Sequence, residues 1–269
     1  MSYDQNKRIK ADAAFVEGDQ ETAFKLYEEG AYEYHDSRCA FNLAFMYYHG
    51  YYVNRDYEKA RKLYDATSYM LGGESNFNLA LMHMRGQGGT VDLEKALSLM
   101  QTSAAAKCIH AQMYLGVAYT LGYIFDPVET ECISMIPFPR VIYRDPTSIL
   151  LEGAGFDQRM EDLRYELIEA DQDTAMDMFF KASLHLDHTY AGKEIGQARF
   201  EYGRGLVEGF GPEYSPKKGY KMIENAAIYG DNIQAMQYLS RNASTARIYG
   251  IDTRRITLLL GDGKKESLE

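Results

Sequence analysis

Two short stretches of this sequence hold residue types that could do chemistry. In the first, His185-Leu-Asp-His188, two imidazoles and a carboxylate offer the donor types that bind zinc. No third ligand follows at helical spacing, so a surface turn explains the segment better, and no metal is predicted.

The second stretch, GRGLVEGFG (203–211), superficially fits a glycine loop that cradles phosphate. It does not follow a predicted strand, and Gly203 and Gly209 also fit the repeat described below. We therefore predict no nucleotide and no other cofactor. The chain shows no Gly-x-Ser-x-Gly motif, no Cys–His signature and no paired catalytic carboxylates at a recognisable spacing. These absences predict that it is not an enzyme.

The elements that would position any site come from an internal repeat. Residues 76–100, NFNLALMHMRGQGGTVDLEKALSLM, nearly restate residues 40–64, AFNLAFMYYHGYYVNRDYEKARKLY. Such a period is the signature of a stacked-repeat architecture.

A looser template extends the repeat along the chain. Each second helix is predicted to begin after a helix-capping residue, with a small residue four positions later. The capping residues are Asp19, Asp56, Asp92, Asp171 and Ser215, and the small residues are Ala23, Ala60, Ala96, Ala175 and Gly219. The apolar residue three positions further on is predicted to be buried. Each first helix carries its own small residue, as at Ala44, and is predicted to end six positions later at Gly50, Gly86, Gly122 or Gly209. Each unit is thus a helix–turn–helix hairpin that must stack on others to bury its apolar stripe.

These residues also carry a family resemblance. NLALMHMRGQGGTVDLEKALSLM resembles a Sel-one-like repeat (SLR), a relative of the tetratricopeptide repeat. The resemblance implies an all-α, right-handed α-solenoid and a non-enzymatic adaptor that binds other proteins. A secreted branch linked to β-lactam binding has paired cysteines in each repeat, which this chain lacks. We predict one domain over 1–269, with repeats near 4–36 (tetratricopeptide-like), 38–72, 74–108, 110–190 and 192–230, then a half repeat or C-terminal cap at 231–249.

An insertion interrupts the fourth repeat. The turn glycine and the small residue of the second helix are ten apart in the clean repeats, but Gly122 and Ala175 are 53 apart. About 43 residues, within 123–170, are therefore inserted in the turn. A helix is predicted at 157–171. Long insertions of this kind are usually functional or disordered, and this one is too apolar for disorder. It is either a plug that packs on the solenoid or a lid over a binding site.

The stripe of each first helix opposite its core residues is the predicted partner-binding groove. Its residues are Arg38, Asn42, Phe45, His49, Glu74, Asn78, Leu81, Arg85, Tyr114, Glu201, Arg204 and Glu208. Asn42 and Asn78 share one repeat position, where a ladder of amides could hold a peptide backbone. The alternative is that this Asn belongs to the fold of the repeat itself.

Charge and composition narrow the function further. The formal net charge is −10, which argues against nucleic acid because phosphate binding needs clustered Lys and Arg. No apolar run is long enough for a transmembrane helix, and the N-terminus lacks a secretory signal. The three cysteines show no paired spacing, so we expect a cytoplasmic protein.

Two functions remain open from the sequence. The first is a scaffold that holds a protein or peptide segment in the groove. The second is a small-ligand sensor or an enzyme with a pocket between the groove and the insertion. The partner and the oligomeric state are not determined by the sequence.

Overall fold

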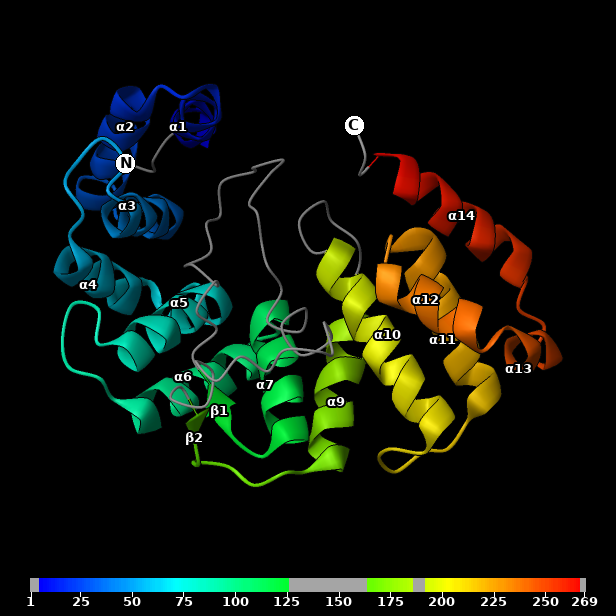
Figure 1. Ribbon diagram of the computed structural model, residues 1–269. Coiled ribbons are helices and arrows are strands. Elements are labelled where there is room, and N and C mark those ends of the chain that lie inside the picture. Colours follow the sequence, from blue (N-terminus) through cyan, green and yellow to red (C-terminus); the bar gives the residue numbers. More distant parts are fainter. Residues whose placement is uncertain (1–4, 126–163, 186–191, 267–269) are drawn as a thin grey trace. The chain divides into compact units, whose positions relative to one another are not determined.

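The computed structural model describes residues 5–125, 164–185 and 192–266, and most of them lie in short helices (Figure 1). The helices are α1 (Gln5–Glu17), α2 (Gln20–Tyr32), α3 (Ser37–His49), α4 (Tyr57–Thr67), α5 (Gly72–Arg85), α6 (Leu93–Ala105), α7 (Ile109–Leu121), α9 (Gln172–Ser183), α10 (Gly192–Glu208), α11 (Pro216–Tyr229), α12 (Ile233–Arg241), α13 (Ala243–Ile248) and α14 (Thr253–Glu266). Two short strands, β1 (Ile124–Phe125) and β2 (Arg164–Tyr165), form an antiparallel pair with Ile124 opposite Tyr165. The fold is an α-solenoid of helix–turn–helix hairpins, as predicted.

The predicted capping residues begin their helices. The Asp56 carboxylate accepts the Lys59 N–H at 2.9 Å, and Asp19, Asp92 and Asp171 cap α2, α6 and α9 in the same way. Each bond satisfies an amide that the first turn leaves without an intrahelical partner. Ser215 precedes α11 as predicted, but its side chain makes no capping bond, and Pro216 fills the first turn instead.

The hairpin turns share one geometry. Gly50, Gly86, Gly122 and Gly209 all have positive φ, between 66° and 80°, which explains why glycine recurs there. After each turn the capping residue donates its N–H back to the first helix. Asp56 bonds to Tyr47 O, Asp92 to His83 O and Ser215 to Leu206 O.

The insertion keeps this turn bond. Asp171 N–H donates to Tyr119 O at 2.9 Å across 52 residues, where the other hairpins span nine. The difference is the 43 residues predicted from the glycine spacing. The prediction of a helix at 157–171 is wrong from Arg164 onward, because β2 and an irregular segment precede α9. Most of the insertion, 126–163, lies outside the described residues, and so does the choice between plug and lid.

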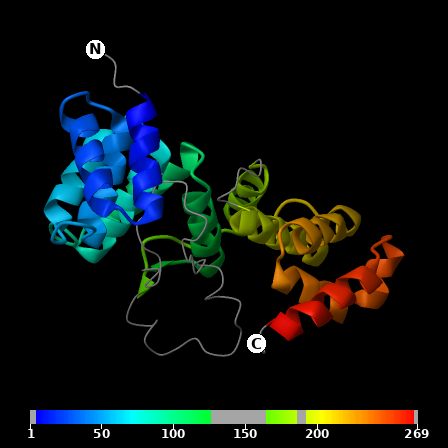
Figure 2. The same cartoon turned by 90° about the horizontal axis from the view of Figure 1, so that it is seen from above.

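The chain divides into two compact units, with the division inside α7. The N-terminal unit contains described residues 5–111, 124–125 and 164–165, and the C-terminal unit contains 112–123, 166–185 and 192–266. Within the N-terminal unit each helix from α1 to α6 packs on the next (Figures 1 and 2). Within the C-terminal unit α9, α10, α11 and α12 pack in the same sequential order. The prediction of one domain over the whole chain stays a prediction.

The buried seam of the second helices lies one residue later than predicted. The residue four positions after the small residue is fully buried in several hairpins, as Tyr27, Tyr64, Met100 and Ile223 show. Of the residues predicted to be buried, three positions after the small residue, only Leu63 is buried, while Leu26, Leu99, Met178 and Met222 are partly exposed.

The last hairpin is longer than predicted. We expected a half repeat or cap at 231–249, but α12 packs against α14, and the short α13 connects them. Ile256 on α14 is fully buried in the same core cluster as Leu239 on α12. Among the described side chains of α14, Ile256 is the buried apolar residue and Leu260 is partly buried. Two apolar positions are too weak a periodic signal to identify a helix from the sequence.

Candidate functional site

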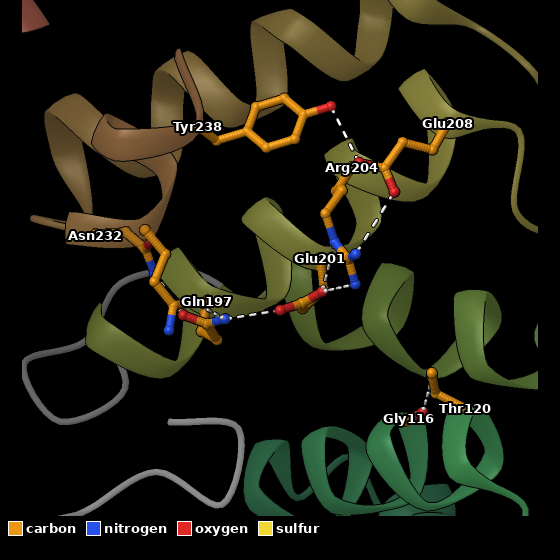
Figure 3. Close-up of polar contacts among 9 residues, drawn as sticks. Gly116, Thr120, Gln197, Glu201, Arg204, Glu208, Asn232 and Tyr238 are labelled. Atoms are coloured by element: carbon orange, nitrogen blue, oxygen red, sulfur yellow. Dashed lines mark hydrogen bonds and ion pairs between the residues drawn. The ribbon is translucent and has the colours of Figure 1, made fainter. Parts of the chain in front are cut away.

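Three predicted groove residues come together on α10 in the C-terminal unit. Glu201, Arg204 and Glu208 follow one another at three- and four-residue spacing, so they share one face of the helix (Figure 3). The Arg204 guanidinium lies 3.0 Å from Glu201 Oε2 and 3.5 Å from Glu208 Oε2. Tyr238 on α12 donates its hydroxyl to Glu208 Oε1 at 3.2 Å. We call these four residues the α10 cluster.

Amide side chains support the α10 cluster from the N-terminal side of the helix. Gln197 lies one turn before Glu201 and donates to Glu201 Oε1 at 2.9 Å. Asn232, the residue that caps α12, donates to Gln197 Oε1 at 2.6 Å (Figure 3). Gln197 and Asn232 are both buried. Their bonds therefore fix the Glu201 carboxylate before any ligand arrives.

The α10 cluster contains a buried and an exposed part. Glu201 is 6% exposed, whereas the side chains of Arg204 and Glu208 are 32% and 30% exposed. Burial raises the pKa of Glu201, and the neighbouring Arg204 guanidinium opposes that rise. Burial and the Glu208 carboxylate raise the pKa of Tyr238. The result is a pre-ordered strip of hydrogen-bonding groups with two carboxylates around one guanidinium.

The remaining predicted groove residues separate by exposure. Arg38 is exposed, while His49, Glu74 and Arg85 are partly exposed. Five others are buried: Asn42, Phe45, Asn78, Leu81 and Tyr114. In this structure the exposed part of the predicted surface is therefore charged, and its apolar and amide members belong to the interior.

Asn42 has a structural role in the N-terminal unit. Its side-chain amide donates to Asp12 Oδ1 on α1 at 3.3 Å, and Tyr27 on α2 donates to the same oxygen at 2.6 Å. Burial raises the pKa of Asp12, and the Tyr27 hydroxyl lowers it in part. The three residues tie α1, α2 and α3 together. This arrangement favours the alternative that Asn42 belongs to the fold of the repeat.

Several partners in these networks were not predicted from the sequence. Asp12, Tyr27, Gln197 and Tyr238 carry no motif of their own. Gln197 alone had a signal, because it lies four residues before Glu201 on the predicted stripe. The others are brought in by tertiary packing of neighbouring helices.

The glycine-rich stretch 203–211 has a structural explanation at every glycine. A Cβ at Gly203 would lie 2.9 Å from the Gly219 carbonyl oxygen, and Cβ atoms at Gly205 and Gly211 would lie within 3 Å of Met176 side-chain atoms. Gly209 has φ of 78° after the end of α10. The stretch therefore shapes the contacts of α10 with α9 and α11.

The zinc-like segment is described only at its first residue. His185 Nε2 lies 3.0 Å from Gln112 Oε1 on α7, and residues 186–188 lie outside the described part. Among the residues that the structure describes, no group of three or more His, Cys, Asp or Glu side chains is placed to hold a metal ion. No helix in that part of the chain has the length and apolarity needed to cross a membrane.

Comparison with known proteins supports the repeat assignment. The Sel1 repeat model matches residues 12–35, 37–66 and 73–108. Human protein sel-1 homolog 2 is 45% identical over 47 residues, which are 18% of this chain and 7% of that protein. The match therefore concerns individual repeats of a much longer protein.

A solved Sel1 repeat structure shows the same fold. A Sel1 repeat protein from Oxalobacter formigenes aligns with a TM-score of 0.58 and 19% identity, over 82% of this chain and 49% of its own. The SLR-fold protective antigen c5321 of uropathogenic Escherichia coli aligns with a TM-score of 0.44 and 18% identity, over 87% of this chain and 47% of its own. This chain thus spans about half the length of either structure. The first alignment extends the shared fold well beyond residues 12–108.

Sel1 repeats generally serve protein–protein interaction. The matched model, the capped hairpins and the αL turn glycines agree with one another over residues 12–108. Residues 12–108 therefore match Sel1 repeats, and the chain shares its fold with a solved Sel1 repeat protein.

Proposed function

We propose that this chain is a non-enzymatic scaffold that binds a protein or peptide segment along the exposed stripe of its first helices. The observation that carries the proposal is the α10 cluster. Its predicted members lie together and are held by hydrogen bonds, and Arg204 and Glu208 remain partly exposed. Repeat arrays form extended binding surfaces, and the α10 cluster lies on one first helix of such an array.

The charge of the α10 cluster indicates how it binds. Two carboxylates and one guanidinium leave one net negative charge, and Glu208 is the exposed acid. A peptide that lies along α10 would place a backbone N–H or a basic side chain against Glu208. Because Gln197 and Asn232 already order the cluster, little side-chain entropy is lost on binding.

A photo-crosslinking experiment tests this proposal. A benzophenone amino acid replaces Phe210, which is 44% exposed just after α10, in one variant and Tyr229, which is 72% exposed on the second helix α11, in the control. In a native extract we expect a discrete protein adduct at position 210 and none at position 229. Equal labelling at both positions, or none at either, contradicts the proposal.

A charge variant completes the test. With the crosslinker at Phe210, Glu208→Lys should abolish the adduct, whereas Glu169→Lys, at an exposed residue before α9, should leave it unchanged. The second substitution makes the same change in net charge. Loss of the adduct in both variants would show that only overall charge matters.

A further inference from the structure

A group of exposed arginines lies where α13 meets α14 in the C-terminal unit. Arg247 is on α13, and Arg254 and Arg255 are in the first turn of α14. We call these three residues the arginine cluster. Elsewhere, basic side chains pair with carboxylates, as Lys25 does with Glu21 and Lys62 with Glu58. Within the described part of the chain, no arginine of the cluster makes an ion pair.

Local hydrogen bonds hold the arginine cluster together. Arg247 Nε donates to Thr253 Oγ1 at 2.9 Å, which fixes this side chain beside the start of α14. The neighbouring acid, Asp252, accepts the Arg254 backbone N–H at 3.1 Å and so caps the helix. Its charge is therefore directed at the backbone, and the terminal guanidinium nitrogens stay available for a ligand.

The position of Arg254 is unfavourable for the helix alone. The positive end of the helix dipole lies at the first turn, where an anion stabilises a helix and a cation destabilises it. Four other second helices place an acid two residues after the capping residue: Glu21, Glu58, Glu94 and Asp173. The second helix α11 has Lys217 there, without a neighbour like Arg247. At the start of α14, the two arginines of its first turn, Arg247 of α13 and the helix dipole together make one positive surface.

An exposed leucine adjoins this surface. Leu258 lies one turn after Arg254 and is 70% exposed. The same repeat position, six residues after the capping residue, holds a polar side chain in the other second helices: Lys25, Lys62, Ser98, Asp177 and Lys221. The last hairpin therefore replaces a solvated polar residue with an apolar one, next to unpaired positive charge.

We propose that the arginine cluster and Leu258 bind an acidic, leucine-containing segment of a protein partner. Guanidinium groups match carboxylates in bidentate geometry, and an anion at the start of α14 relieves the unfavourable dipole interaction. Leu258 supplies apolar contact area beside the charges. The surface is made of other residues than the α10 cluster, so the inference goes beyond the proposed function.

Fluorescence anisotropy with a defined probe tests the proposal. The probe is a short fluorescein-labelled peptide of Glu and Leu, and the matched control peptide contains Gln in place of Glu. The full chain should bind the Glu peptide at least about tenfold more tightly than the Gln peptide. Added salt should weaken binding, because exposed charges are screened.

Two double variants carry the same change of net charge. Arg254→Glu with Arg255→Glu should weaken binding at least about tenfold. Lys95→Glu with Lys217→Glu, at exposed residues outside the cluster, should weaken it less than about twofold. The first variant should also have a higher melting temperature, because acids suit the first turn of α14. That rise shows that lost binding is not lost folding.

Three results would overturn the proposal. One is equal weakening by the two double variants, and another is equal affinity for the Glu and Gln peptides. The third is binding of the chain to phosphatidylserine-containing vesicles, lost in Arg254→Glu with Arg255→Glu, without binding to the Glu peptide. That result would assign the surface to a membrane. None of these outcomes bears on crosslinking at Phe210, so the two proposals are tested separately.

Discussion

The α3–α4 hairpin of the N-terminal unit and the α10–α11 hairpin of the C-terminal unit differ in how their two helices pack against each other. At the two small positions the first hairpin has Ala44 and Ala60, both fully buried. The second has Gly203 and Gly219, where a Cβ on Gly219 would lie 2.5 Å from the Gly203 carbonyl oxygen. The second pair of helices therefore meets backbone to backbone. A repeat position that tolerates only small residues is thus adjusted, hairpin by hairpin, to the separation of the helices.

The largest expected effect comes from exchanging glycine and alanine at the small position of the second helix. Gly219→Ala should lower the free energy of unfolding by about 1–3 kcal/mol, because the new methyl group also meets Val207 at 2.7 Å. Ala60→Gly in the N-terminal hairpin should cost only about 1 kcal/mol, from lost helix propensity and a small cavity. Urea denaturation monitored by circular dichroism measures both. A neutral Gly219→Ala would show that the helices can separate without cost.

The second effect concerns two polar networks, the one around Asp12 in the N-terminal unit and the α10 cluster in the C-terminal unit. Asn42→Ala removes a buried donor from the Asp12 carboxylate and should destabilise the fold by about 1–2 kcal/mol. Glu208→Gln, in the exposed part of the α10 cluster, should change stability by less than about 0.5 kcal/mol. The same urea titration compares them. Equal, small effects would contradict the structural role of Asn42.

The smallest effect is a pH dependence specific to the N-terminal unit. Burial and the Arg61 guanidinium, 3.0 Å from its Nε2, hold the pKa of His83 below its ordinary value of 6.5. The folded state then binds fewer protons than the unfolded state between that lowered pKa and 6.5. The stabilising contribution is complete above pH 6.5 and is lost as the pH falls through the lowered pKa.

Glu201 in the C-terminal unit makes a contribution of opposite sign to the pH dependence of stability. Its raised pKa makes the folded state bind more protons, so its contribution to stability decreases as the pH rises from 4.5. Urea denaturation midpoints measured across this pH range check both assignments. As the pH falls, His83 lowers the stability of the protein and Glu201 raises it, so His83→Gln should remove the loss and Glu201→Gln should remove the gain. A pH profile unchanged by both variants would contradict the two assignments.

Most of the fold was predictable because it rests on local chemistry that recurs. Each repeat needs a carboxylate that caps a first turn and a glycine that accepts positive φ. The same residue types therefore recur from repeat to repeat, as Asp56 and Gly50 show. The size of the insertion followed from the same residue types, because Gly122 still forms the turn before it and Asp171 still caps the helix after it. No recurring residue type marked β2 or α14, so neither element was predicted from the sequence.

The candidate site was predictable only in part. Spacing on one helix placed Glu201, Arg204 and Glu208 on a common face, because helical periodicity is a local property. Periodicity does not say whether a face is open or covered, so the sequence offered Asn42 and Arg38 as equals, while the structure buries one and exposes the other.

The sequence by itself determined that this protein is a stack of capped helical hairpins. Capping, turn geometry and small-residue spacing each act within a few residues. The tertiary structure alone decided that Tyr238 joins Glu208, that Asp12 accepts from Asn42, and that Gly203 must meet Gly219 without side chains. Those contacts join separate helices, and their distances are set by how neighbouring helices pack.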